Sequence, residues 1–313
     1  AACASFPPAP RPTTTPAIVG DRLIAADGAA LGLAAWTAPE PKAVVVAVHG
    51  MNDYSNAFRP LGEALKAQGF AVYAYDQRGF GRSPGFGRWP GSATLKQDLR
   101  SAIAAARAAQ PGRPLFVLGH SMGAAVVLAA MKDEALDADG VILGAPGVWG
   151  SAQMPVLYRL SLNLAAAFTP GKTLTGERTG RQSTDNIPLL RAMYKDPLVI
   201  KGTRIDAILG VVRVMGEGYD ASKSVKGRIL VLTGAKDQII PVRAQQATAK
   251  RLCGEVSAKL YPNGWHMIFS DLGAAAVWRD VGAWMSETAE KGAAGPAVRP
   301  GPAAKNCSAG RAA

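Results

Sequence analysis

The chain has 313 residues, and 48% of them are hydrophobic, which suffices for one large domain or two small ones with buried cores. Its 35 Lys and Arg residues exceed its 23 Asp and Glu residues, so the formal net charge is +12. The basic residues are scattered, which argues against nucleic acid as a partner, and no apolar run reaches the roughly 20 residues that a membrane-spanning helix needs. We therefore expect a soluble globular body whose positive charge favours an acidic substrate or an anionic membrane surface.

The two ends are rich in Pro, Ala and Gly and show no apolar period, so flexible segments are expected over 1–17 and 290–313. Between them, short β-branched runs alternate with helical patterns, which is typical of a mostly parallel sheet covered by helices on both faces. The predicted α/β core comprises residues 18–147 and 222–289, and an insertion spans 148–221.

Three cysteines, Cys3, Cys253 and Cys307, lie far apart and none belongs to a CxxC pair, so the sequence implies neither zinc nor thioredoxin-like chemistry. Cys253 is interpreted as a small packing residue. The small residues directly before Cys3 resemble the end of a bacterial lipoprotein signal sequence. Two alternatives stay open: a periplasmic or membrane-anchored lipoprotein modified at Cys3, or an ordinary cysteine in the leader of a soluble protein.

The elements of the core follow from apolar runs and their period. In chain order the sequence predicts a strand over 43–49, a helix over 59–68, a strand over 70–76, a helix over 93–109, strands over 114–118, 141–143, 228–232 and 258–261, and helices over 124–131, 242–252 and 274–288. The strand over 43–49 is continuously apolar, as expected of a parallel strand that is buried on both faces.

The insertion carries two amphipathic patterns. The first consists of Leu157, Leu160, Leu164 and Phe168, and the second of Ile205, Ile208, Leu209, Val212 and Met215. Because the insertion leaves the core near the predicted nucleophile, we expect a helical cap over the site; the alternative is that both stripes simply pack on the core. As a cap, it would bind substrate through Leu157, Leu160, Ile208 and Val212.

The predicted nucleophile is Ser121, in Gly119-His120-Ser121-Met122-Gly123. This Gly-x-Ser-x-Gly pattern lies between a predicted strand and a predicted helix, where the glycines allow a sharp turn that lifts the serine oxygen clear of the sheet. The helix also points its amino end at the site, which favours developing negative charge. The pattern alone is short and common, and the predicted strand before it and helix after it make it specific.

A serine hydroxyl needs a base, and a third group must orient that base. The chain has only three histidines. His120 adjoins the nucleophile and should project away from its oxygen, and His49 ends a strand where it would shape a loop, which leaves His266 as the base. Asp237 follows a strand and lies between Ser121 and His266 in chain order, so it is the predicted acid; Glu255 and Asp271 are the competitors.

The oxyanion of acyl transfer requires backbone donors. One should be the amide of Met122, and the other the amide of Met51, in the loop after the strand that ends at His49. The residues that surround these positions are predicted to contact substrate: His49, Gly50, Asn52 and His120. No metal and no organic cofactor is implied.

Taken together, these features resemble the α/β-hydrolase fold, and more closely its monoacylglycerol lipase and lysophospholipase branch, over about residues 20–288. The resemblance rests on the segments His49-Gly50-Met51, Asp76-Gln77-Arg78-Gly79-Phe80-Gly81-Arg82-Ser83, Gly119-His120-Ser121-Met122-Gly123 and Asp196-Pro197-Leu198-Val199, and on the order Ser121, Asp237, His266. It implies esters of long-chain acids with glycerol or glycerophosphate alcohols, bound under an apolar cap that can dock on a membrane.

The chain departs from this branch after Gly50. Where monoacylglycerol lipases typically continue His-Gly-x-Gly-Glu-His, the sequence reads His49-Gly50-Met51-Asn52-Asp53-Tyr54. A backbone oxyanion donor is unaffected by this change, but the resemblance does not extend here to recognition of a glycerol head group.

The expected activity is hydrolysis of lipid-like carboxylic esters through an acyl-enzyme on Ser121. An amidase or aminopeptidase on the same scaffold, and transfer of the acyl group to an acceptor other than water, remain open. A non-catalytic binding module is disfavoured because candidates for all three catalytic roles are present.

Overall fold

The computed structural model describes residues 6–149, 156–175, 180–291 and 299–300. Its strands are β1 (Ala17–Val19), β2 (Arg22–Ile24), β3 (Ala30–Thr37), β4 (Val44–Val48), β5 (Ala71–Tyr75), β6 (Leu115–His120), β7 (Gly140–Gly144), β8 (Thr173–Thr175), β9 (Gly202–Arg204), β10 (Val225–Gly234), β11 (Cys253–Tyr261) and β12 (Arg299–Pro300). The helices are η1 (Ser55–Phe58), α1 (Arg59–Ala67), α2 (Ser92–Ala109), α3 (Met122–Asp133), α4 (Val156–Phe168), α5 (Ile187–Lys195), α6 (Ile205–Ala221), α7 (Val242–Arg251) and α8 (Ala274–Glu290).

The main sheet has the strand order β1-β2-β3-β5-β4-β6-β7-β10-β11. Strands β5, β4, β6, β7, β10 and β11 run parallel, whereas β1, β2 and β3 pair antiparallel and join β5 in the antiparallel sense. The chain leaves β4 toward β5 on one side and later returns to β6 on the other. Ligands bind beyond the carboxyl ends of strands at such a switch, so β4 and β6 are well placed to carry a site.

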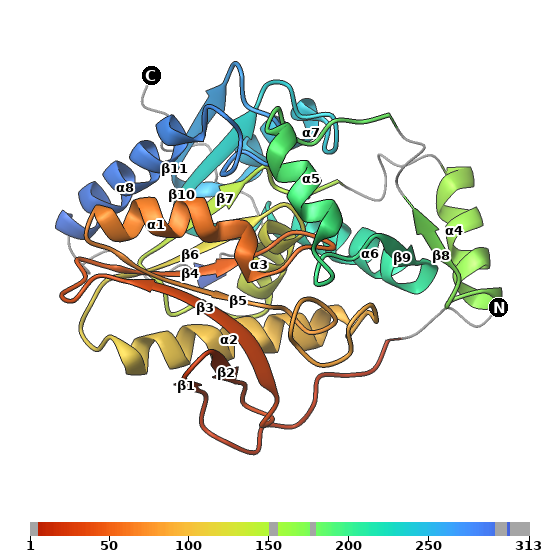
Figure 1. Ribbon diagram of the computed structural model, residues 1–313, viewed down its shortest axis with the longest axis horizontal. Helices are drawn as coiled ribbons and strands as arrows, with labels where there is room; N and C mark the ends of the chain where they lie inside the picture. The colour runs from red at the N-terminus through yellow and green to blue at the C-terminus, as the bar shows by residue number, and fades with distance from the viewer. Residues whose placement is uncertain (1–5, 150–155, 176–179, 292–298, 301–313) are drawn as a thin grey trace.

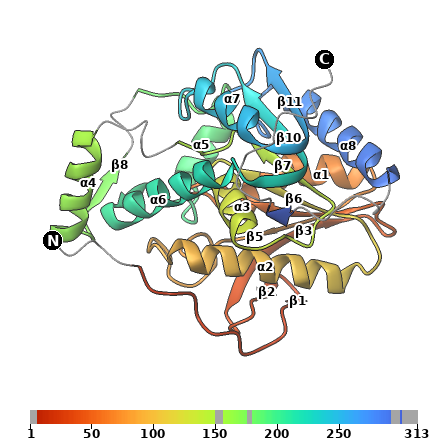
Figure 2. The same ribbon diagram turned by 180° about the vertical axis from the view of Figure 1, so that it is seen from behind.

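Helices cover both faces of the sheet, with α1 and α8 on one face and α2 and α3 on the other (Figures 1 and 2). Strand β4 shows why its sequence is continuously apolar. Val44, Val46 and Val48 belong to the core on the α2 and α3 side, whereas Val45 and Ala47 belong to the core on the α1 and α8 side. Since successive side chains of a strand point to opposite faces, burial on both faces leaves no polar position. The predicted fold class is confirmed.

The N-terminal part of the sheet was not predicted. Strands β1 and β2 have only three residues each, too few for a recognisable alternation. The segment before them, expected to be flexible, contacts the body: the Phe6 ring lies 6.4 Å from the Trp89 ring, and the amides of Thr13 and Thr14 donate to the Ala26 carbonyl. Isolated aromatic contacts and turn hydrogen bonds leave no period in the sequence.

The insertion between β7 and β10 supplies α4, β8, α5, β9 and α6, which gather beyond one end of the sheet (Figures 1 and 2). Its longest helix, α6, has two packing partners. Ile205 and Leu209 near its start form a small buried cluster with Leu162 and Ala166 of α4. Near its end Gly218 lies so close to α3 that a Cβ atom there would be 2.9 Å from the Ala125 carbonyl oxygen. The second apolar pattern therefore serves both the insertion and the core.

The apolar stripe of α4 is largely exposed. Leu157 is 77% exposed and Leu160 is 55% exposed, and Leu164 and Phe168 are exposed as well. The opposite face of the helix packs, through Leu162 and Ala166. Leu157 and Leu160 therefore lie on the uncovered side of α4, so this stripe does not pack on the core, and their contact with substrate stays a prediction. A stripe of apolar residues at helical spacing does not by itself say which side of the helix is covered.

The remaining predictions concern the cysteines and the C-terminal segment. Cys253, which begins β11, is disulfide-bonded rather than merely packed, and its partner lies outside the described residues. Cys3 also lies outside them, as does most of the predicted C-terminal tail, in which Arg299–Pro300 pairs with β10. Among the described residues no helix is long and apolar enough to cross a membrane.

Candidate active site

Ser121 occupies the tight turn between β6 and α3. Its backbone has φ 53° and ψ −117°, a strained conformation for a residue with a side chain. The flanking glycines are required by close approach: a Cβ at Gly119 would lie 2.6 Å from the Ala124 Cα, and a Cβ at Gly123 would lie 2.1 Å from the Val48 carbonyl oxygen. The motif thus brings the turn directly against the end of β4.

Three residues that are distant in sequence meet at this turn. The Ser121 hydroxyl lies 2.9 Å from Nε2 of His266, and Nδ1 of His266 lies 2.8 Å from Oδ2 of Asp237. All three residues are less than 10% exposed. Because a carboxylate only accepts hydrogen bonds, Nδ1 carries the proton and Nε2 is free to accept the serine proton.

The Asp237 carboxylate is fully engaged. Burial opposes its ionisation, but the hydrogen bond from His266 and the backbone amides of Ile239 and Ile240 outweigh this effect, so the pKa of Asp237 lies below its usual value. Gln245 donates from Nε2 to Oδ2 of Asp237 at 2.8 Å. The sequence analysis missed Gln245, because a glutamine on an amphipathic helix usually faces solvent whereas this one is fully buried.

Neither competing acid contacts the base. Asp271 accepts from the backbone amide of Trp265 at 2.7 Å and so holds the loop that carries His266. Glu255 is exposed on β11 and pairs with Arg228. The structure brings Asp237, and not these two carboxylates, to the imidazole of His266.

The other two histidines turn out to support the site and do not line it. His49 is fully buried; its Nδ1 donates to the Gly50 carbonyl at 2.7 Å and its Nε2 accepts from the Gln77 amide at 2.9 Å. His120 donates from Nε2 to the main-chain carbonyl of His266 at 2.9 Å. Since these backbone groups occupy the rings, the structure does not support His49 and His120 as substrate-binding residues.

Two backbone amides beside Ser121 have no acceptor within the described parts of the chain: those of Met51 and Met122. Met122 is the first residue of α3, where an amide has no intrahelical partner. The loop before Met51 passes close to the nucleophile, since a Cβ at Gly50 would lie 3.2 Å from the Ser121 Cβ. Such a pair of free donors next to a serine can stabilise a developing oxyanion.

The loop over 50–54, called the oxyanion loop below because it carries the Met51 amide, is also tied to the insertion. Asn52, which has φ 66°, donates from Nδ2 to Oγ1 of Thr203 at 2.7 Å, and its carbonyl accepts from the Ile200 amide at 3.0 Å. Tyr54 donates to Oδ2 of Asp196 at 2.7 Å. Of the residues predicted to contact substrate from the insertion, Ile208 and Val212 are partly buried against the α4 and α6 cluster.

A family model described as serine aminopeptidase, S33, matches residues 39–273. The chain belongs to this α/β-hydrolase family. The matched region includes β4 to β11 and the insertion between β7 and β10, so Ser121, Asp237 and His266 all lie within the S33 family match.

Among curated relatives, the chain is similar to a monoacylglycerol lipase of Mycolicibacterium smegmatis, with 29% identity over 80% of this chain and 90% of the relative. It is also similar to the human monoglyceride lipase, with 22% identity over 88% of this chain and 93% of the relative.

Among solved structures, the monoacylglycerol lipase of Paleococcus ferrophilus superposes with a TM-score of 0.70 at 24% identity, over 83% of this chain and 99% of that one. The soluble variant of the monoglyceride lipase from Saccharomyces cerevisiae, in complex with a substrate analogue, has a TM-score of 0.68 at 20% identity, over 91% of this chain and 99% of that one. These structural similarities establish the fold that this S33 family chain shares with them.

Proposed function

We propose that the protein is a serine hydrolase that cleaves lipid-like carboxylic esters of the monoacylglycerol or lysophospholipid type, with Ser121 as nucleophile, His266 as base and Asp237 as orienting acid. The observation that carries the proposal is the continuous hydrogen-bonded path from the Ser121 hydroxyl through His266 to Asp237. The names of the relatives in several organisms support the substrate class.

In the first half of the reaction, Ser121 Oγ attacks the ester carbonyl while Nε2 of His266 takes its proton. The carbonyl oxygen becomes an oxyanion, and the amides of Met51 and Met122 donate to it. Asp237 stabilises the imidazolium that has formed. When the tetrahedral intermediate collapses, the alkoxide leaves with the proton from His266, and the acyl group stays on Ser121.

In the second half, a water molecule takes the place of the alcohol. His266 removes a proton from this water as the oxygen attacks the acyl-enzyme, and the same two amides stabilise the second oxyanion. Collapse returns the proton to Ser121 Oγ and releases the carboxylic acid. All groups are thereby restored to their starting protonation states.

The decisive experiment uses a fluorophosphonate probe together with matched substrates. Wild-type protein should be labelled on Ser121 and should hydrolyse medium-chain and long-chain esters faster than acetyl esters, whereas Ser121→Ala should do neither. An unlabelled wild type, or equal labelling of Ser121→Ala, would instead favour a binding module. Cleavage of acetyl esters alone would remove the lipid preference.

We propose an ester hydrolase rather than an amidase because of the names of the relatives. The family description names an aminopeptidase, but the two curated relatives described above are named lipases. A panel of esters and amides with identical acyl groups separates the two activities: faster turnover of the amides would replace the ester hydrolase by an amidase. Supplying alcohols as acceptors in the same assay tests acyl transfer.

We also propose a peripheral location at a lipid surface. The exposed apolar face of α4 and the net charge of +12 support contact with anionic membranes. The disulfide at Cys253 supports an oxidising compartment, and lipid modification of Cys3 would fit that compartment. Mass spectrometry of protein from its native membranes tests the anchor, since an unmodified Cys3 would exclude it.

A further inference from the structure

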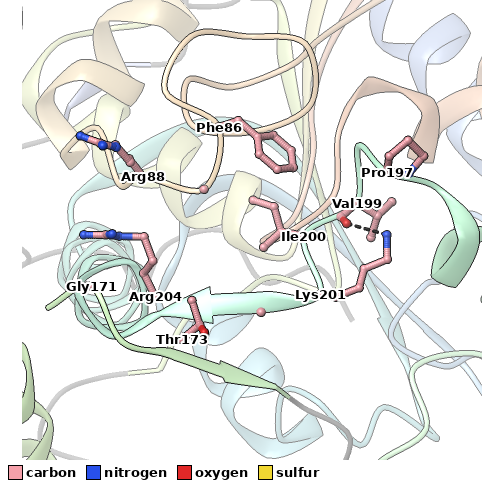
Figure 3. Close-up of a pocket in the computed structure, with 11 residues that line it drawn as sticks. Phe86, Arg88, Gly171, Thr173, Pro197, Val199, Ile200, Lys201 and Arg204 are labelled. Carbon is pink, nitrogen blue, oxygen red and sulfur yellow. Dashed lines mark hydrogen bonds between the residues drawn. The ribbon is translucent and has the colours of Figure 1, made fainter. Parts of the chain in front are cut away.

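A cavity of about 470 Å³ opens where the insertion meets the loop that follows β5 (Figure 3). Phe86 and Arg88 contribute from the loop, and the stretch 199–204 contributes from the insertion. Phe86 and Ile200 lie on facing walls, while the side chains of Arg88 and Arg204 extend in the same direction (Figure 3). One part of the cavity is therefore apolar and another is cationic.

Three cationic side chains line this cavity, those of Arg88, Lys201 and Arg204, and no carboxylate is among its lining residues. Arg88 is exposed, and its guanidinium makes no hydrogen bond or ion pair with any residue that the structure describes. Arg204 is paired with Asp206, through contacts of 3.0 and 2.6 Å. One carboxylate thus stands against three positive charges.

The ammonium group of Lys201 donates to main-chain carbonyl oxygens and is not paired with any carboxylate in the described part of the chain. Its Nζ donates to the carbonyl oxygens of Val199 and Asp196. The Asp196 carboxylate is turned elsewhere, because Oδ2 accepts from Tyr54 and Oδ1 accepts from the Leu198 amide. The cavity therefore keeps an excess of positive charge within reach of a ligand.

A second, smaller cavity joins residues of both regions. Its lining includes Met51 and Asn52 from the loop after β4, together with Arg88 and Arg204. Met51 follows Gly50, the residue that lies against Ser121. The two arginines line both cavities, and Met51, whose amide is a candidate oxyanion donor, lines the smaller one with them.

We propose that Arg88 and Arg204 form an anion subsite for the alcohol part of the substrate, so that the preferred ester is one of a phosphorylated alcohol. This inference rests on the proposed ester hydrolase. Arginine suits the role because its planar guanidinium binds phosphate oxygens through two parallel hydrogen bonds. The subsite lies beside the loop at which the sequence departs from the glycerol-binding pattern of the monoacylglycerol lipases.

Asn52 adds a polar group to the lining of the smaller cavity. Its Oδ1 is buried and has no hydrogen-bond partner in the described chain, and Asn52 lines the smaller cavity. A buried acceptor without a donor is unfavourable unless a ligand supplies one. A free hydroxyl on the phosphorylated alcohol would donate to it, which is the chemistry of an acyl glycerol phosphate.

The test compares two monomeric substrates with the same acyl chain, octanoyl glycerol and octanoyl glycerol phosphate. Wild-type protein should have the higher kcat/KM for the phosphorylated ester, and the preference should fall as salt is added. In Arg88→Gln the kcat/KM for the phosphorylated ester should drop by about 10-fold, and that for the neutral ester should change less than about twofold. Arg243→Gln removes an exposed arginine that lines neither cavity and should change neither value.

Equal kcat/KM values for the two esters in wild type, or an equal loss for both in Arg88→Gln, would overturn the subsite. A third outcome would also overturn the subsite. If the two monomeric esters are hydrolysed equally, but neutral octanoyl glycerol is hydrolysed faster on anionic vesicles than as a monomer, the cations attract the protein to a surface and do not bind the substrate.

A binding measurement separates this inference from the proposed activity. Ser121→Ala should bind octyl phosphate about 10-fold more tightly than octyl glycerol by calorimetry, and adding Arg88→Gln should remove the difference. Equal affinities would overturn the subsite even if the esterase is active. A clear difference would support the subsite even if neither ester is hydrolysed, in which case only the proposed function fails.

Discussion

The imidazole of His120 donates from Nε2 to the main-chain carbonyl oxygen of His266, over 2.9 Å, and the two rings lie 5.2 Å apart. The neighbour of the nucleophile in sequence thus holds the backbone of the base. Burial lowers the pKa of His120 to about 4, so the ring is neutral, and carries this donor, throughout the neutral range. The nucleophile turn and the loop of the base are joined as one unit.

Substituting His120 tests this link. His120→Phe keeps the ring against Phe269 but removes the donor, so the loop of His266 loses an anchor. We expect kcat to fall by about 10-fold with little change in KM, since ground-state binding does not use this ring. His120→Gln, which can restore an amide donor, should recover part of the loss. Equal activity of all three proteins would show that the link has no positioning role.

Gln245 should position Asp237. Gln245→Leu removes the hydrogen bond from Nε2 to the Asp237 carboxylate and leaves the Ile240 carbonyl short of a donor, which should lower the free energy of unfolding by about 1–3 kcal/mol. The kcat should fall as well, because the imidazole of His266 is less firmly oriented. Urea denaturation and steady-state kinetics give the two readouts. Gln246→Leu changes the exposed neighbour and should match wild type in both.

Thr203 connects the insertion to the oxyanion loop through Oγ1 and the Asn52 side chain. Thr203→Val keeps the shape of the side chain and removes only the acceptor. If the loop position depends on this contact, kcat should drop by roughly 3–10-fold, corresponding to about 1 kcal/mol of lost transition-state stabilisation, with KM less affected. Thr175→Val, at an exposed position on the neighbouring strand β8 that lines neither cavity, is the matched control. An unchanged kcat in Thr203→Val would mean that the oxyanion loop holds its position alone.

Asp53 gives a pH-dependent prediction. Burial, opposed by the Tyr54 amide and reinforced by Asp196, raises the pKa of Asp53 to about 6. Between about pH 4 and 6 the folded chain binds this proton and the unfolded chain does not, so the unfolding free energy falls as pH rises through this window. Asp53→Asn avoids that loss, and it should be about 1–2 kcal/mol more stable than wild type at pH 8 and equal to it near pH 4.

Urea denaturation at the two pH values checks this expectation. Asp220→Asn, at an exposed position on α6, is the matched control for the loss of one carboxylate. A destabilised Asp53→Asn at pH 8 would mean that the ionised carboxylate makes favourable contacts that outweigh its burial.

Much of the fold could be predicted because its signals are local. The run over β4 is apolar throughout, since both of its faces are buried, and the Gly-x-Ser-x-Gly turn needs its glycines for close approach to Val48. The nucleophile, the acid and the base could be predicted in this order because each of them follows a strand that is recognisable in the sequence. By contrast, β1 and β2 are too short to show a period, and α5 is short and has a proline as its second residue.

The sequence by itself determined the three residues to be tested and the order in which the strands carry them. Tertiary structure alone decided which face of α4 is covered, since an apolar stripe does not name its partner, and which polar residues surround Asp237. It also decided that Arg88 and Arg204, more than 100 residues apart in the chain, line the same two cavities. Ser121 and His266 could be paired by chemistry, but charges without a motif are brought together only by packing.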